Sequence, residues 1–274
     1  MSFPGAWRND LIPLRDENPS GTMPVVTLAL IITNVLVFMY EVAHGLEPVI
    51  LEYGLMPASV WSLGGAEVSL GDLPPVTAEI AAQLSARATD AVARASLSPL
   101  YFVTAMFLHG GIMHIVGNMW FLWLFGDNIE DRLGHKAFVV FYLVCGIAAS
   151  VAHVLYVGVD STTPMVGASG AIAGVLGAYL ICYPRARVLT LVPIFIFIQF
   201  IRLPAFVFLF LWFGLQIYGA VAASATPDAP GVAWLAHVGG FAVGSVFVIF
   251  WPKSKRSQQA KYQATPDLIR AKRS

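Results

Sequence analysis

Residues 166–174 read VGASGAIAG and lie inside a long apolar part of the chain. They set one polar side chain, Ser169, among glycine and alanine residues. Small residues let two membrane helices approach closely, and a serine among them is most often a packing residue. The alternative is that Ser169 is a nucleophile, which requires a base and oxyanion donors elsewhere in the sequence.

The composition is that of an integral membrane protein. Of the 274 residues, 57% are hydrophobic and 12% are charged, whereas a soluble domain has about 25% charged residues. The zero net charge, and the lack of a basic patch interleaved with aromatic residues, argue against a nucleic-acid partner. The two cysteines lie in apolar runs without metal-ligand spacing. We therefore expect a lipid bilayer as partner, and no nucleic acid, metal or cofactor.

Six apolar segments are predicted to span the membrane. A further apolar piece at 189–201, between Arg187 and Arg202, has only 13 residues and contains a proline. It is too short to cross a bilayer as a helix, so we expect it to be interfacial or re-entrant. The short apolar run at 99–108 has the same interpretation. The predicted spans are residues 24–43, 112–126, 137–157, 168–183, 203–223 and 232–251.

With six spans both termini lie on one side of the membrane, and nearly all lysines and arginines fall on that side. The positive-inside rule therefore predicts cytoplasmic termini. The long outer loop at 44–98 has helical spacing of apolar residues over 77–96, which predicts a short amphipathic helix on the outer surface. The predicted organisation is a cytoplasmic N-terminal segment at 1–23, a six-helix domain at 24–252 and a cytoplasmic basic tail at 253–274.

Polar side chains lie near the outer ends of the second, fourth and sixth spans, which all run from outside to inside. They are His114 and Asn118, Ser169, and His237. At 1.5 Å per residue, the distances to the span ends place the serine and both histidines roughly 8–10 Å below the outer boundary. Independent packing residues have no reason to share one depth. The shared depth therefore indicates one submerged site.

Small residues allow the fourth and sixth spans to touch. Contact between their small faces would bring Ser169 and His237 within hydrogen-bond distance. The imidazole would then take the hydroxyl proton as the serine attacks a carbonyl. The glycines expected to serve this packing are Gly167, Gly170, Gly240 and Gly244.

The tetrahedral intermediate of such a reaction needs hydrogen-bond donors. Ser169 opens a helix, so backbone N–H groups are free there. His114 and Asn118, at i and i+4 on one helix face, add two side-chain donors. No Asp or Glu lies in the spans at this depth, so we expect a Ser–His dyad without a carboxylate. GASG is not the G-x-S-x-G elbow, because Ala171 holds the last position.

Together these motifs resemble those of the rhomboid intramembrane serine proteases. The resemblance covers residues 24–252, with the motifs in the same order. It rests on the GASG box, the histidine and glycine pair of the sixth span, HGGIMHIVGN at 109–118 and EDRLG at 130–134. It implies an all-α polytopic membrane protein of the prokaryotic form, a six-transmembrane-helix rhomboid-like bundle with a submerged, water-accessible active site.

For individual residues, the resemblance implies Ser169 as nucleophile and His237 as general base. His114, Asn118 and the backbone amide of Ser169 would hold the oxyanion. The fifth span would be a movable lateral gate, and transmembrane protein substrates would be cut near the outer face. Family members often have an aromatic residue one turn after the serine, packed on the histidine, whereas this chain has Ala173.

Three alternatives stand beside the protease. A rhomboid-like pseudoprotease would bind transmembrane clients without cleaving them, but it would lack the serine or the histidine. A proton or solute pathway would predict acidic residues within the spans, and Glu41 at the edge of the first span is the nearest case. A zinc site built from His109, His114 and His237 lacks an H-E-x-x-H motif.

The compact six-span form predicts that the protein lies in a prokaryotic cell inner membrane.

Overall fold

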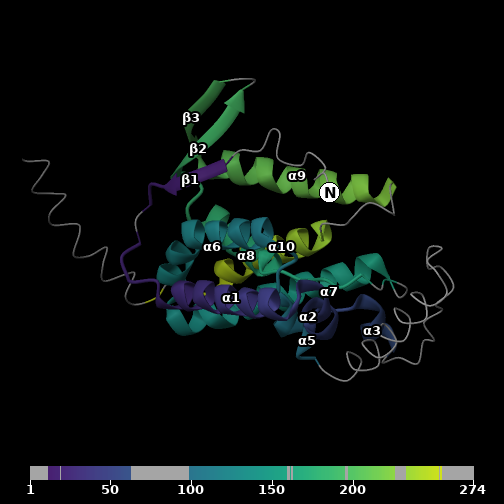
Figure 1. Ribbon diagram of the computed structural model, residues 1–274. Helices are drawn as coiled ribbons and strands as arrows, with labels where there is room; N and C mark the ends of the chain where they lie inside the picture. The colour runs from purple at the N-terminus through teal and green to yellow at the C-terminus, as the bar shows by residue number, and fades with distance from the viewer. Residues whose placement is uncertain are drawn as a thin grey trace, which may run out of the picture.

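The computed structural model is a helical bundle with one small sheet beside it (Figure 1). It describes residues 12–18, 20–62, 99–158, 161, 163–194, 197–225, 233–252 and 254. The helices are α1 (Val25–His44), α2 (Leu46–Tyr53), α3 (Pro57–Ser62), α5 (Tyr101–Thr104), the 3-10 helix η1 (Ala105–Phe107), α6 (Ile112–Leu133), α7 (His135–Val157), α8 (Ser169–Cys182), α9 (Ala205–Ala225) and α10 (Trp234–Phe250). The strands are β1 (Ile12–Asp16), β2 (Arg187–Ile194) and β3 (Phe197–Pro204).

Each of the six predicted spans overlaps one helix (α1, α6, α7, α8, α9 or α10), and α6 continues to Leu133, beyond the predicted end at 126. Among the described helices, α1 and α7 are long and apolar enough to cross a membrane by length and composition. A third crossing results if the α5–η1 segment and α6, which meet at 95°, form one bent span. Helices α8 and α10 are shorter, with 14 and 17 residues. The count of six crossings therefore stays a prediction.

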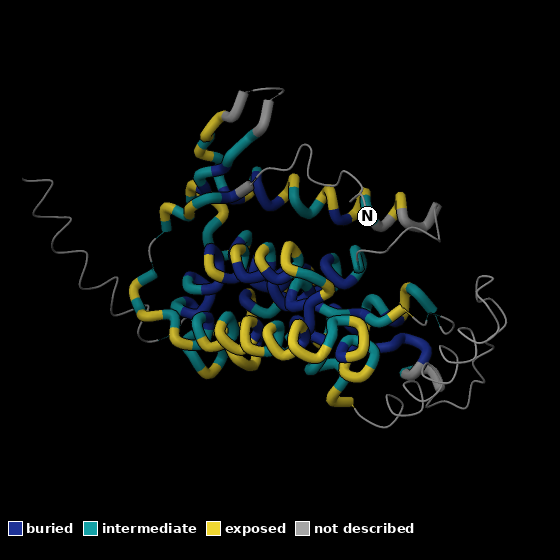
Figure 2. The backbone as a smooth tube through the Cα atoms, viewed as in Figure 1, coloured by how far each residue is buried: buried dark blue, intermediate teal, exposed yellow. Residues whose placement is uncertain are grey.

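Helix α8 lies in the middle of the bundle and is buried over most of its length (Figure 2). It is apolar all round, as expected of a helix enclosed by protein. Helix α10 packs along it through glycines. A Cβ on Gly240 would lie 2.0 Å from the carbonyl oxygen of Gly170, and one on Gly244 would lie 2.0 Å from that of Gly174. Only residues without a side chain allow two backbones to approach this closely.

The surface of the bundle is apolar as well. The outward face of α1 is exposed in Figure 2, and Ile32, Leu36 and Met39 are among its exposed side chains. Helix α9 exposes Phe210 and Leu211 in the same way. Large apolar side chains exposed along whole helices fit the hydrocarbon of a bilayer and not water.

Side chains at the C-terminal end of α6 form hydrogen bonds to the start of α1 and to the residue after α10. The carboxylate of Glu130 accepts hydrogen bonds from the backbone N–H groups of Val26 and Thr27, both at 2.8 Å, and from the Thr27 hydroxyl at 2.7 Å. It thereby caps the first turn of α1. Arg132 donates to the carbonyl of Trp251, just beyond α10, at 3.1 Å. The start of α1 and the end of α10 therefore meet at the same end of the bundle, as an even number of spans requires.

The apolar piece at 189–201, expected to be interfacial or re-entrant, forms most of a β-hairpin. Strand β2 pairs antiparallel with β3 along its whole length, and β1 pairs antiparallel with the other side of β2. The segment is rich in β-branched and aromatic residues, which favour strands, and it is too short for a crossing helix. The strand β1 was not expected, because residues 1–23 contain no apolar run.

The N-terminal strand is bound to α6 as well as to the hairpin. The indole N–H of Trp120 donates to the carbonyl of Pro13 at 2.6 Å. The side-chain amide of Asn128 donates to the carboxyl of Asp16 at 2.9 Å. Burial raises the pKa of the Asp16 carboxyl to about 6. Because β3 ends at Pro204 and α9 begins at the next residue, the sheet holds one end of α9.

The predicted outer loop at 44–98 is described up to residue 62, where it contains α2 and α3. The amphipathic helix predicted over 77–96 lies outside the described residues. So does nearly all of the predicted basic tail at 253–274.

Candidate active site

Ser169 is the first residue of α8. In the loop before it, the N–H of Gly167 donates to the carbonyl of Ala105 at 2.8 Å. Gly167 has φ 123°, a backbone conformation that favours glycine. A Cβ at this position would lie 2.8 Å from the His114 ring. The loop therefore passes directly against His114 as the chain enters α8.

Packing between α8 and α10 brings Ser169 and His237 together. The serine Oγ and the histidine Nε2 are 2.7 Å apart, which is a short hydrogen bond. His237 lies in the first turn of α10 and is buried. A hydroxyl within reach of an imidazole nitrogen is the arrangement from which a base can activate a nucleophile.

The other ring nitrogen of His237 contacts α9. Its Nδ1 lies 2.6 Å from Oε1 of Gln216. An amide oxygen only accepts hydrogen bonds, so the proton of the neutral ring is assigned to Nδ1 and the lone pair of Nε2 faces Ser169. The rings of Trp212 and Trp234 flank the imidazole, with centroids 6.0 Å and 6.4 Å away.

Asn118 and His114 present donors beside the GASG loop. The Asn118 side chain is buried, and its Nδ2 has no hydrogen-bond partner among the described residues. That nitrogen lies 3.7 Å from the point where a Cβ of Gly167 would stand. The N–H of Gly110 approaches Nδ1 of His114 at 3.4 Å, which assigns the proton of that neutral ring to Nε2, beside Gly167. Two N–H donors thus converge on the start of α8.

His109 packs against His114, one of these two donors. Its ring packs edge-on against that of His114, with centroids 5.1 Å apart. Its backbone N–H donates to the carboxylate of Glu41 at 3.0 Å and 3.2 Å. Glu41, which the sequence places at the edge of the first span, thus ties α1 to the turn before α6. Among the residues that the structure describes, no three His, Cys, Asp or Glu side chains converge as a metal site would.

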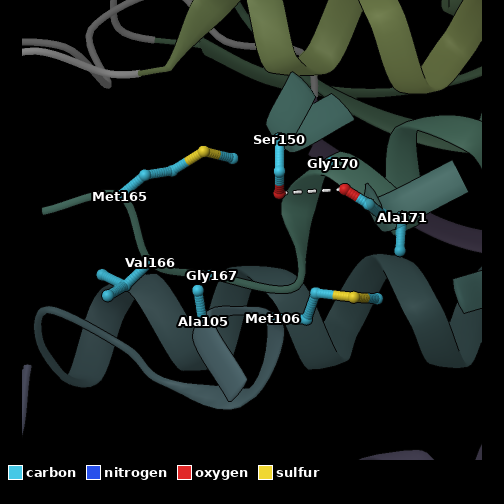
Figure 3. Close-up of a pocket in the computed structure, with 9 residues that line it drawn as sticks. Ala105, Met106, Ser150, Met165, Val166, Gly167, Gly170 and Ala171 are labelled. Carbon is cyan, nitrogen blue, oxygen red and sulfur yellow. Dashed lines mark hydrogen bonds between the residues drawn. The ribbon is translucent and has the colours of Figure 1, made fainter. Parts of the chain in front are cut away.

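A small pocket adjoins the first turn of α8 (Figure 3). The methionines Met106 and Met165 border it, together with Gly167 and Gly170. Its lining is apolar except for the Ser150 hydroxyl, which donates to a backbone carbonyl of its own helix at 3.0 Å. The pocket therefore supplies no further reactive group to the site.

Gln216 is the residue of the site that the sequence reasoning missed. It is a lone amide within the apolar stretch AFVFLFLWFGLQIYGAVA at 205–222, and polar groups in such stretches need a partner. That pattern was visible in the sequence. The partner was not, because His237 lies on another helix.

The Rhomboid domain family matches residues 97–254, which is more than half of the chain. The chain belongs to the rhomboid family. The matched range contains α6 to α10, and so every residue of the geometry described above except Glu41. This rhomboid is accordingly an integral membrane protein with a helical bundle.

Individual rhomboid relatives match shorter segments. RHOMBOID-like protein 6, mitochondrial, of Arabidopsis thaliana is 38% identical over 78 residues, which are 28% of this chain and 24% of that protein. Presenilin-associated rhomboid-like protein, mitochondrial, of Mus musculus is 36% identical over 102 residues, 36% of this chain and 26% of that protein. Rhomboid protease GluP of Bacillus subtilis (strain 168) is 41% identical over 78 residues, 28% of this chain and 15% of that protein.

The matched segments thus span about a quarter or less of the length of these relatives. Two of the three are named as mitochondrial and one is bacterial. The relatives therefore do not support the expected prokaryotic inner membrane over a mitochondrial one.

Proposed function

We propose that this rhomboid is an intramembrane serine endopeptidase in which Ser169 is the nucleophile and His237 the general base. The observation that carries the proposal is the 2.7 Å contact between the serine Oγ and Nε2 of the histidine. The histidine tautomer supports it, because the lone pair of Nε2 faces the hydroxyl proton. The relative named as a protease in Bacillus subtilis supports the same class of activity.

In the first half of the reaction, Oγ of Ser169 attacks the carbonyl carbon of the scissile peptide bond while its proton passes to Nε2 of His237. The tetrahedral intermediate then collapses. Its C–N bond breaks, the amine leaves with the proton from Nε2, and the acyl group stays on Oγ. In the second half a water molecule attacks the ester carbon and gives a proton to Nε2, and that proton returns to Oγ as the acid leaves.

The negative oxygen of the tetrahedral intermediate requires donors that are in place before the reaction. The backbone N–H of Ser169 is at the start of α8, where no intrahelical partner is available. The side chains of Asn118 and His114 add the two donors beside Gly167. Within the part of the chain that the structure describes, Nδ2 of Asn118 has no partner. This supports the role, because a buried donor without a partner is costly unless a ligand uses it.

The substrates are transmembrane segments of membrane proteins. Such a segment enters laterally past α9 and presents an extended peptide bond, because the carbonyls of a helical segment are already engaged. The proposed protease domain is residues 24–252, with six spans, both termini cytoplasmic and the site submerged below the outer face. A prokaryotic cell inner membrane stays our proposal for its location, and no cofactor or metal takes part.

The rival function is that of a pseudoprotease that binds transmembrane clients without cutting them. It would be favoured by loss of the serine or histidine, and this chain retains both in hydrogen-bond contact. We therefore propose the protease.

The test is labelling by a fluorophosphonate, which reacts with activated serines. The full chain in liposomes should become labelled, and Ser169→Ala and His237→Ala should abolish both labelling and cleavage of a transmembrane substrate. Asn118→Ala and His114→Ala should slow cleavage, and chelators should leave it unchanged. Labelling that persists in Ser169→Ala, or a folded wild type that neither labels nor cleaves, would overturn the proposal.

A further inference from the structure

Helix α9 contributes one hydrogen-bonding group to the site, the Gln216 side chain. We propose that Gln216 is the positioning residue that holds His237 in its proton-accepting tautomer, so that the dyad is complete only while α9 is packed against α10. This inference rests on the proposed protease function. It adds a third residue, and a third helix, to the serine and the histidine.

Both ends of the Gln216 amide are engaged in a way that assigns its orientation. Its Nε2 donates to the carbonyl of Trp212, one turn earlier on α9, at 3.3 Å. A carbonyl cannot donate, so the NH₂ group must point to Trp212 and the oxygen must point to His237. The oxygen then accepts the Nδ1 proton of His237 at 2.6 Å. The hydrogen bonds all donate in one direction, from the Ser169 hydroxyl through His237 and Gln216 to the Trp212 carbonyl of α9.

Gln216 fills the place that a carboxylate occupies in a serine–histidine–aspartate triad. Its side chain is buried, and a neutral amide costs less than an ionised carboxylate in a membrane-buried position. As His237 becomes protonated during the reaction, the bond from Nδ1 to Oε1 becomes a charged hydrogen bond, which is stronger than a neutral one. Without an acceptor, the ring would lose its preference for Nδ1–H. The other tautomer directs a proton at Ser169 and cannot act as base.

The same helix also supplies the aromatic support that Ala173 does not. The Trp212 ring lies 6.0 Å from the His237 ring. The rings of Trp212 and Phe213 stack on Phe241 of α10, at 6.2 Å and 4.4 Å. The contacts that dock α9 on α10 are therefore adjacent to the contact that positions the histidine.

Ser169 and His237 lie on α8 and α10, whose glycine contacts keep them together, whereas Gln216 lies on a helix at the side of the bundle (Figure 1). Movement of α9 away from α10 removes the acceptor from Nδ1 but leaves the serine and histidine neighbours. Entry of a substrate past α9 and chemistry at Ser169 are thus successive states. The histidine regains its orientation when α9 returns.

The test compares two substitutions of similar length. Gln216→Met removes the acceptor and should slow fluorophosphonate labelling and lower kcat roughly 10- to 100-fold, with KM unchanged. Gln216→Glu keeps an acceptor oxygen in either protonation state and should restore most of the rate. Leu215→Met, on the exposed face of the same helix, is the matched control and should behave as wild type.

A spectroscopic measurement of the His237 tautomer tests the inference independently of the labelling and cleavage rates. Nitrogen NMR of ¹⁵N-histidine-labelled protein should show the His237 proton on Nδ1 in wild type and Gln216→Glu, and a shift toward Nε2 in Gln216→Met. Full activity and unchanged tautomer in Gln216→Met would overturn the inference. Equal loss in the Met and Glu variants would also overturn it, because it would indicate packing alone. Failure of the protease proposal is distinct, since it would appear as a wild type that does not label.

Discussion

Adding one methyl group at Gly244, which contacts neither Ser169 nor His237, should break the hydrogen bond between those two side chains. In Gly244→Ala the new Cβ would lie 2.0 Å from the Gly174 carbonyl oxygen and 2.5 Å from its Cα, and neither backbone atom can rotate away. Helices α8 and α10 must therefore separate by about 1 Å or more, at a cost of roughly 1–3 kcal/mol. A separation of that size lengthens the 2.7 Å contact of Ser169 and His237 beyond hydrogen-bond range.

A misplacement of about 1 Å in a catalytic site reduces the rate roughly 100-fold. We therefore expect the labelling rate of Ser169 in liposomes to fall by that order in Gly244→Ala, together with a lower melting temperature in detergent. Gly214→Ala is the control. Gly214 is exposed on α9, and a Cβ there meets nothing within 4 Å. Equal labelling rates and melting temperatures in the two variants would refute the reasoning that this backbone contact sets the serine–histidine distance.

Three further predictions concern the end of the bundle at which α6 stops. Glu130→Ala should lower the free energy of unfolding by roughly 1–3 kcal/mol, measured by denaturation in detergent, because the buried N–H of Thr27 loses its acceptor. Burial raises the pKa of the Asp16 carboxyl from 3.8 to about 6, so the fold favours the protonated carboxyl. The stability that this gives the folded protein is fully present below pH 3.8 and is lost as pH rises through about 6. Wild-type melting temperature should therefore fall relative to Asp16→Asn across that interval, and parallel curves would contradict the assignment. Arg202→Ala removes an exposed ion pair with Glu17, so its denaturation should differ from wild type by less than about 1 kcal/mol.

The long helices could be predicted because apolar length alone indicates them. The positions of Ser169 and His237 near the starts of α8 and α10 followed from counting residues along those segments. Their contact was expected from small residues on both faces, and the structure places Gly240 and Gly244 where α8 and α10 touch. Gly167 lies before α8, where its positive φ and its distance to His114 explain the need for glycine.

The sheet and Gln216 could not be derived in the same way. The segment at 189–201 is apolar on nearly every residue, so periodicity could not separate a strand from a re-entrant piece. Strand β1 exists only because β2 offers it an edge, which is a contact between distant parts of the chain. Gln216 stood out as polar, but a helix sequence does not specify which neighbour its side chain meets. The sequence therefore predicted the serine and histidine that the structure places in contact, and missed the glutamine that contacts the histidine.

The three-stranded sheet has a consequence for how α9 can move. Its strands hold the Pro204 end of α9 to the bundle, partly through β1, which α6 binds at Pro13 and Asp16. A helix that is held at one end can move only by rotating about that end. The displacement at any residue of α9 then grows with its distance from the held end, and Gln216 lies 11 residues, or about 16 Å, along the helix. Strand β1 thus forms part of the pivot for the helix whose Gln216 contacts the histidine.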